Sequence, residues 1–344
     1  MADSGGHWVN LAAAEKLTED DQVAGFIEED IKRGNPALML PVQQQTGTNL
    51  KWLREKIVGS AQRADIGSQL VWTDESDYDE ITRKAKIIYK QTPLNNYVRD
   101  VYGSFNNYAA IQNKEITKAM IRQMGDDILY GDTLNGGSNQ PNGLHALAAL
   151  YPTPLNGVTD GLNINENEAG LSLANMRLIE QRMRHGIDFW LFPFEIAAQL
   201  DAYVQENGVS TFTASRITIT MDQLGEQILK WNGKPIVRSD YLVAEQQNTG
   251  VDSTSTRDKF ATNDRQYSVF ALKTGHPALQ EPGVGLIFGG NNRDPGELMK
   301  STFFPVLEDF DASGIRKTSY YNVADGSIMA IGRIFDIENL AVIA

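Results

Sequence analysis

The chain has 344 residues, 41% of them hydrophobic and 22% charged, with a net charge of −13 and no cysteine. This length suggests two domains, and the acidic balance argues against a stand-alone nucleic-acid binder, which normally carries a basic patch. An acidic wall could still enclose nucleic acid, because it would repel phosphates and let a polymer slide. The lack of cysteine excludes disulfides, thiolate chemistry and cysteine-based zinc sites, and fits a reducing compartment.

The first residues, MADSGGHWVNLAAAEKLTEDD, lack a basic start followed by an apolar core, so we expect no signal peptide. No apolar run approaches the ~18–20 residues that cross a bilayer, so we expect no membrane partner. Residues 1–50 carry three Lys or Arg against eight Asp or Glu. Within them, 18-TEDDQVAGFIEEDIKRGNP-36 predicts a helix with one apolar stripe, ended by Gly34 and Pro36. That helix either packs on its own domain or forms an arm that docks on a neighbouring subunit.

Residues 51–90 predict a long hairpin with arms 57-IVGSAQRADIGSQLVW-72 and 81-ITRKAKIIYK-90 around an acidic tip, 74-DESDYDE-80. The tip fails the calcium-loop pattern, because its sixth and twelfth positions are Asp79 and Ala85 and not Gly and Glu. A hairpin with few large apolar side chains is marginal alone, so we expect it to lie against something else. Its charged residues are candidates for contacts with a neighbouring subunit: Arg63, Asp77, Asp79, Arg83, Lys84 and Lys86.

Residues 107–131 predict the clearest helix, since Ile116, Met120, Met124 and Ile128 recur at every fourth position. We expect Asn107 at its N-cap and Gly131 at its end. A helix of this length reaches roughly 36 Å, enough to span a domain. The stretch that follows, up to residue 143, is rich in Gly, Asn, Ser and Pro, and reads either as a phosphate-binding loop or as a joint between domains.

From residue 172 the pattern becomes helix, strand, helix: 173–185, then the apolar run 187–192, then 193–207. Asn232-Gly233 between two apolar runs predicts a tight hairpin. Further strands are expected at 267–273 and 284–290, and two or three between 316 and 343, with a turn at Asp325-Gly326.

The sequence does not match common enzyme motifs. The chain has no G-x-S-x-G and no H-E-x-x-H, and its four histidines, which we read as structural, stand far apart in sequence. The Gly-rich stretch after residue 131 lacks G-K-[ST] and follows a helix, whereas a phosphate-binding loop follows a strand. The run 283-GVGLIFGG-290 begins an apolar strand and is not followed by a helix. We therefore predict no enzyme, no catalytic residue, no cofactor and no metal site.

Three segments carry a resemblance: 128-ILYGDTLNGGSNQPNGLHAL-147, 223-QLGEQILKWNGKPIVRSDYL-242 and 326-GSIMAIGRIFDIENLAVI-343. In this order they resemble the major capsid proteins of tailed bacteriophages, the Hong Kong 97-like fold. The resemblance implies an α+β fold with an N-terminal arm at 1–50 and an extended β-hairpin loop at 51–90. It also implies a peripheral domain at 91–145 and 305–344, with spine helix 107–131, and an α/β axial domain at 146–304. The Gly-rich stretch then becomes a joint that follows the spine helix.

The same resemblance implies a protein that self-assembles as hexamers and pentamers into an icosahedral head around double-stranded DNA. Its partners would be copies of itself, a separate scaffolding protein, a portal, a decoration protein and packaged DNA bound without sequence specificity. It would be located in the virion after assembly in the bacterial host cytoplasm. We expect no Lys–Asn cross-link, since neither residue matches a motif. Three alternatives stay open: an encapsulin-type compartment shell, a soluble α/β enzyme that uses the Gly-rich loops, and a tail or other virion protein.

Overall fold

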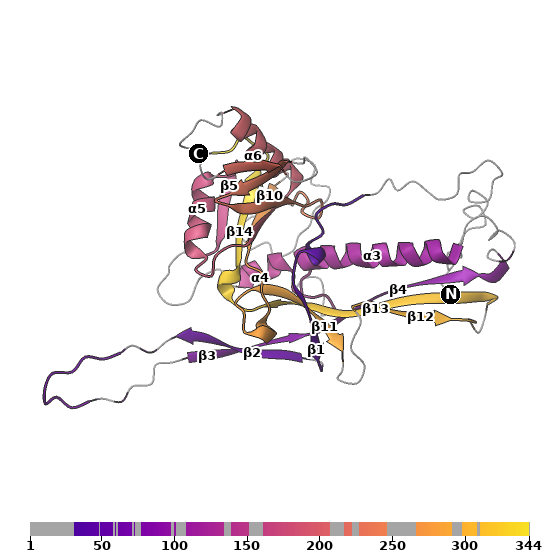
Figure 1. The fold of residues 1–344 in the computed structure, drawn as a ribbon, viewed down its shortest axis with the longest axis horizontal. Coiled ribbons are helices and arrows are strands. Elements are labelled where there is room, and N and C mark those ends of the chain that lie inside the picture. Colours follow the sequence, from indigo (N-terminus) through magenta and orange to yellow (C-terminus); the bar gives the residue numbers. More distant parts are fainter. Residues whose placement is uncertain are drawn as a thin grey trace.

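The computed structural model describes residues 31–47, 49–57, 59, 61–70, 72, 77–97, 100, 108–133, 139–150, 161–206, 217–221, 227–245, 266–290, 298–307 and 310–343. They form three parts: a compact α/β unit, a long platform of strands beneath one helix, and a hairpin that projects away from both (Figure 1). Within these residues no helix is both long and apolar enough to cross a lipid bilayer. The predicted helix at 18–36 falls mostly outside the described residues.

The compact unit is built on a seven-stranded sheet. Its strands, in spatial order, are β5 (Asn163–Ala169), β14 (Ile331–Glu338), β10 (Gln266–Leu272), β6 (Phe189–Phe192), β9 (Lys234–Arg238), β8 (Gln227–Trp231) and β7 (Ile217–Met221). Helices α5 (Leu173–Arg182) and α6 (Phe194–Glu206) accompany it. Every side chain of β6 is buried. Trp190 and Phe192 enter the core beneath the helices, whereas Phe189 and Leu191 enter a second core at the junction with the platform. Covering on both faces explains why this strand is apolar throughout.

The platform is a five-stranded sheet. It consists of β1 (Val42–Thr46), β11 (Val284–Gly290), β13 (Ala312–Asp325), β12 (Lys300–Phe304) and β4 (Lys86–Asn95), the last of which pairs with β13. The long helix α3 (Tyr108–Tyr130) lies along this sheet (Figure 1). Three one-turn 3-10 helices complete the described elements: η1 (Pro36–Leu38), η3 (Pro277–Leu279) and η4 (Ile328–Ala330).

Helix α3 confirms the predicted spine helix. Ile116, Met120, Met124 and Ile128 are all buried, as their four-residue spacing requires. On the sheet beneath, the Tyr321 hydroxyl donates to Asp127 at 2.7 Å and the Lys317 ammonium donates to Thr117. The expected N-cap, Asn107, lies outside the described residues.

The described ends of the Gly-rich stretch, residues 131–133 and 139–143, connect two helices. At the end of α3 the Gly131 amide makes an i→i−4 bond to the Asp127 carbonyl at 2.8 Å, and the Gly143 amide donates to the Gly131 carbonyl at 2.6 Å. Helix α4 (Leu144–Leu150) starts at once. A Cβ on Gly143 would lie 2.8 Å from the Asp127 carbonyl oxygen, so only glycine lets the two helix ends approach this closely.

The hairpin predicted at Asn232-Gly233 is confirmed, because β8 and β9 are antiparallel and both turn residues have positive φ, 48° and 79°. The projecting hairpin differs from its prediction. Its paired strands are β2 (Asn49–Ile57) and β3 (Asp77–Lys84), with Arg54 opposite Asp79. The acidic segment around Asp79 is therefore not the tip. It lies in a strand, where its side chains alternate between two faces.

The boundaries between the parts also differ from the expected ones. The segment after Lys84 is β4, part of the platform and not of the extended loop. Strand β11 belongs to the platform although it falls within the expected axial segment 146–304. Strand β14, from the expected peripheral segment, belongs to the seven-stranded sheet. Asp325-Gly326 is a turn between two sheets. Local sequence patterns do not show which distant strands pair. The observed boundaries between the parts therefore differ from the expected ones.

Candidate functional site

The base of the projecting hairpin is fixed by one buried carboxylate. Arg54 of β2 and Arg83 of β3 lie on the same face of the hairpin and converge on Asp325 at the end of β13. The Arg54 Nη2 lies 3.1 Å from Oδ2, and Arg83 donates to Oδ1 through Nε at 3.0 Å and Nη2 at 2.8 Å. The Asp325 side chain is fully buried. Two fork-shaped guanidinium groups on one carboxylate hold the hairpin to the platform.

Of the predicted contact residues, Arg83 is the one that the structure places differently. Its guanidinium pairs with Asp325 of its own chain, and its side chain is 14% exposed. Arg63, Asp77, Asp79 and Lys84 have exposed side chains, and Lys86 is half-buried at the start of β4. The sequence analysis missed both partners of this cluster, Arg54 and Asp325. Asp325 belongs to the expected Asp-Gly turn, so the sequence alone indicates a turn residue and gives no sign of its burial.

The distal part of the hairpin exposes large apolar side chains. Ile66 and Trp72 are fully exposed, and Leu70 is 74% exposed. Closer to the base, Leu53 and Tyr78 are exposed on the hairpin face that does not carry Arg54. They lie beside the Lys51–Glu80 ion pair, in which Nζ and Oε1 are 2.6 Å apart. Apolar groups gathered on a projecting element make it a candidate interaction surface.

The platform presents a second apolar surface on the face away from α3. Ile87 and Tyr89 of β4 are each 63% exposed, and Tyr320 of β13 lies opposite Ile87. Tyr321, the next residue, points to the other face and contacts α3. One sheet face is therefore covered by the spine helix, and the other is open.

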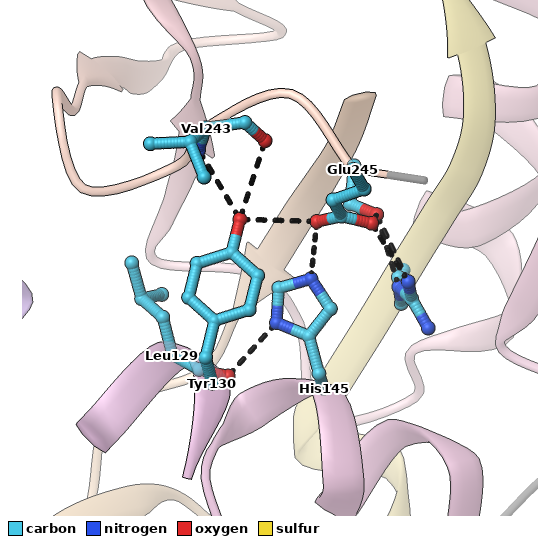
Figure 2. Close-up of polar contacts among 7 residues, drawn as sticks. Leu129, Tyr130, His145, Val243 and Glu245 are labelled. Carbon is cyan, nitrogen blue, oxygen red and sulfur yellow. Dashed lines mark hydrogen bonds and ion pairs between the residues drawn. The ribbon is translucent and has the colours of Figure 1, made fainter. Parts of the chain in front are cut away.

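A buried polar cluster joins the spine helix to the seven-stranded sheet (Figure 2). Its centre is Glu245, whose carboxylate accepts from Tyr130 at 3.1 Å and Ser268 at 2.7 Å, contacts His145 Nε2 at 2.5 Å and pairs with Arg333 at 3.2 Å. His145 Nδ1 contacts the Leu129 carbonyl at 2.8 Å. These residues come from α3, α4, β10 and β14, elements of both the platform and the compact unit.

Burial alone would raise the pKa of Glu245, but His145, Arg333 and Ser268 outweigh it and lower the pKa from 4.5 to about 2. The cluster therefore holds a carboxylate that is charged at neutral pH and has partners on every side. Tyr130 and His145 contact one carboxylate oxygen, and Ser268 and Arg333 contact the other, so the carboxylate links α3 and α4 to the seven-stranded sheet. Glu245 carried no sequence signal, because it lies in a polar stretch.

The Gly-rich strand and Asp188 both make close contacts within the chain. Gly285, in the apolar Gly-rich strand, packs against the Gly275 carbonyl, where an added Cβ would lie 2.7 Å away. Asp188 lines a groove of about 620 Å³ and is paired with Lys273 at 2.8 Å and with Thr274. In the part of the chain that the structure describes, no group of three or more His, Asp or Glu side chains is placed to hold a metal ion.

No protein family model matches the sequence, and no curated protein sequence matches it. Solved structures are similar over almost the whole chain. The encapsulin complex of Synechococcus elongatus PCC 7942 has a TM-score of 0.63 at 12% identity, over 97% of both chains. The capsid of a native GTA particle has a TM-score of 0.58 at 12% identity, over 94% of this chain and 97% of that one. The capsid of cyanophage P-SCSP1u has a TM-score of 0.56 at 10% identity, over 91% of both chains.

Proposed function

Because the chain has the Hong Kong 97-like capsid fold, we propose that it is a structural shell protein and not an enzyme. Specifically, it is a major capsid protein whose hexamers and pentamers form the icosahedral head of a tailed phage around double-stranded DNA. The observation that carries the proposal is the fold match over more than nine-tenths of this chain and of capsid chains. A match over 97% and 91% of these two capsid chains favours the same kind of assembly.

Within this proposal, the platform with α3 is the peripheral domain, the seven-stranded unit is the axial domain, and the projecting hairpin is the extended loop. The arm expected at residues 1–50 overlaps the platform, since β1 starts at Val42. The virion is the protein's location, after assembly in the host cytoplasm. Its partners are copies of itself, a scaffolding protein, a portal, a decoration protein and packaged DNA held without sequence specificity. The net charge of −13 suits a wall along which DNA slides.

The hairpin is the proposed subunit interface. It cannot bury Ile66, Leu70 and Trp72 on its own, and a neighbouring subunit would remove them from water. Arg63, Asp77, Asp79, Lys84 and Lys86 would flank this apolar contact, whereas Arg83 is reassigned to the base of the hairpin. Single exposed ion pairs contribute little, so repetition across a large obligate interface is what stabilises the shell.

A second candidate is an encapsulin-type compartment, which encloses protein instead of DNA. The similarity to an encapsulin, with a TM-score of 0.63 over 97% of both chains, favours it. The two candidates share the fold and differ in content. The acidic charge does not separate them.

The deciding experiment measures size and content together. Light scattering and negative-stain microscopy on the purified protein, expressed alone and with its neighbouring genes, should show closed shells or hexameric and pentameric capsomers. Nuclease-protected DNA inside the shells supports the phage head, and a co-purified protein within them supports the compartment. A monomer or dimer under all these conditions contradicts both.

The charged flank of the hairpin is tested by a double charge reversal, Arg63→Glu with Lys84→Glu. Both side chains are exposed, so subunit folding should be unchanged while shell yield falls. Arg83→Glu is the contrasting variant, since it should destabilise the subunit itself by leaving a buried carboxylate beside a like charge. Normal shell yield from the double variant would show that Arg63 and Lys84 lie outside the interface.

A further inference from the structure

Two histidines of the described chain, His145 and His276, are buried and have different hydrogen-bond partners. A neutral imidazole ring carries one N–H donor and one unprotonated nitrogen that accepts, whereas the charged ring carries two N–H donors. The partners of the two ring nitrogens therefore indicate how many protons each buried ring holds.

The partners of His276 call for one proton. Its Nδ1 accepts a hydrogen bond from the Ala278 amide at 3.2 Å, so this nitrogen is unprotonated. Its Nε2 lies 3.2 Å from the Leu286 carbonyl oxygen, which can only accept, so this nitrogen carries the proton. Burial lowers the pKa of His276, which agrees with a neutral ring.

The partners of His145 call for two protons (Figure 2). Its Nδ1 lies 2.8 Å from the Leu129 carbonyl oxygen, and its Nε2 lies 2.5 Å from Oε1 of Glu245. Neither oxygen has a proton to donate while the Glu245 carboxylate is ionised. If the ring held a single proton, one of its nitrogens would set its lone pair against an oxygen lone pair, and this is true of both tautomers.

The proton between His145 and Glu245 belongs to the ring and not to the carboxylate. The other carboxylate oxygen, Oε2, accepts from the Ser268 hydroxyl at 2.7 Å and pairs with the Arg333 guanidinium at 3.2 Å. Both contacts favour the ionised carboxylate. A neutral carboxyl group would also remove the charge that Glu245 presents to Arg333 inside the protein, which is costly.

The aromatic side chains around His145 suit a cation. Tyr130 stacks on the imidazole with 4.3 Å between the ring centroids, and Phe270 packs against it in an edge-on arrangement at 4.8 Å. The negative face of an aromatic ring attracts a cation. The ring is therefore enclosed by groups that accept hydrogen bonds or attract positive charge.

The ionisable groups of this cluster come from every element packed around the ring. Tyr130 belongs to α3, Glu245 follows the short segment after β9, and Arg333 and Asp336 belong to β14. Burial raises the pKa of Asp336, which interacts with the charges of Arg333 and Glu245. The contact of His145 with Glu245 is the part of the cluster that depends on a proton from a histidine.

We propose that His145 holds both ring protons in the folded chain at neutral pH and is a proton-dependent link between the spine helix and the seven-stranded sheet. The Leu129 carbonyl lies at the end of α3, and Glu245 forms a β-bridge with Gln266 of β10. Loss of one proton opposes two lone pairs at this junction, so the link weakens as the pH rises. The inference concerns the single subunit and does not depend on shell formation.

Magic-angle-spinning NMR of the full chain labelled with ¹⁵N-histidine counts the protons directly, because protonated and unprotonated ring nitrogens have well separated resonances. It applies equally to sedimented subunits and to sedimented shells. His7→Gln, His185→Gln and His276→Gln together leave His145 as the sole histidine. At about pH 7, where an ordinary histidine is largely neutral, this chain should show no unprotonated ring nitrogen.

The matched control keeps His276 in place of His145. His7→Gln, His185→Gln and His145→Gln together should show one unprotonated nitrogen at the same pH, which proves that the signal is detectable. An unprotonated nitrogen in the chain that keeps His145 overturns the proposal. If a triple variant does not fold, His7→Gln with His185→Gln leaves both buried rings and the cluster untouched, and two unprotonated nitrogens in that chain overturn it equally.

The pH dependence of stability tests the consequence for the junction. Because the folded chain holds a proton that the unfolded chain releases, the urea midpoint of wild type should fall between about pH 7 and about pH 9. The fall should be smaller in His145→Gln, whose side chain does not titrate. His276→Gln removes a buried ring that is already neutral, so it should keep the wild-type slope. Parallel curves for wild type and His145→Gln would show that the junction does not depend on this proton.

Discussion

At the scale of single residues, two buried carboxylates hold the molecule together. Glu245 joins the spine helix to the seven-stranded sheet, and Asp325 joins the hairpin to the platform. Each accepts from groups on elements that are distant in sequence. Removing one member of a buried ion pair is costly because it leaves the other charge without compensation. These two side chains should therefore be far less replaceable than exposed acids such as Glu80.

Glu245→Gln should destabilise the subunit by about 3–5 kcal/mol, because Arg333 and His145 lose the charge of their shared buried partner. The free energy of unfolding from urea titration measures this. Glu80→Gln removes an exposed carboxylate and is the matched control, with little change expected. Equal stability of the two variants would show that the cluster contributes no more than a surface pair.

The pH dependence of Glu245 has a definite sign. Its pKa in the folded chain is about 2, below the ordinary 4.5, so its stabilisation is complete above pH 4.5 and is lost as the pH falls toward 2. Wild type and Glu245→Gln should therefore converge in stability over that range, by about 3 kcal/mol. Urea titrations at several pH values test the convergence. A gap that stays constant down to pH 2.5 would contradict the lowered pKa.

At the scale of elements, the sequence predicted what local patterns encode. The spine helix, the apolar strand β6 and the Asn232-Gly233 turn follow from spacing and turn chemistry within a few residues. The sequence did not predict which sheet each strand belongs to. Strand β1 pairs with β11 from the other end of the chain, and β13 and β14 are neighbours in sequence that lie in different sheets. The partners of Asp325 were hidden for the same reason, since Arg54 and Arg83 meet it only through long-range pairing.

Asp325→Asn should loosen one element in particular. Without its charge, Arg54 and Arg83 lose their shared partner, so the hairpin base should weaken by about 3 kcal/mol. Hydrogen exchange should quicken in β2 and β3 while the amides of α3 keep their protection. Glu80→Gln in the same hairpin should leave the exchange unchanged. Faster exchange throughout the subunit would mean that Asp325 supports the whole fold and not the hairpin alone.

At the scale of the whole molecule, the architecture separates folding from association. Both cores lie within the compact unit and at its junction with the platform. Two groups of exposed apolar side chains lie elsewhere: Ile66, Leu70 and Trp72 on the projecting hairpin, and Ile87, Tyr89 and Tyr320 on the open face of the platform. Substitutions in the cores should therefore change the stability of the subunit, whereas substitutions of the exposed apolar groups should change its assembly.

Leu70→Ser with Trp72→Ser should leave subunit folding intact but prevent shell formation. Burying a side chain of this size contributes about 1.5–3 kcal/mol, and the loss recurs at every copy of the interface. Sedimentation and electron microscopy measure assembly, and circular dichroism checks the fold. Leu70→Met with Trp72→Phe, which keeps the apolar area, should restore shells. Shells from the serine variant at wild-type yield would remove these residues from the interface.

The long-range pairing of the platform also governs the order in which a newly made chain matures. Strand β1 cannot pair until β11 has been synthesised. The base of the β2–β3 hairpin cannot close until Asp325 has been synthesised. Strand β5 waits for β14. At ~5–20 residues per second, the hundreds of residues between these partners take tens of seconds to synthesise. A nascent chain on the ribosome therefore has neither sheet complete, and a chain that terminates before β13 lacks the anchor for its hairpin. A chain that stops before β13 therefore cannot form the anchored hairpin.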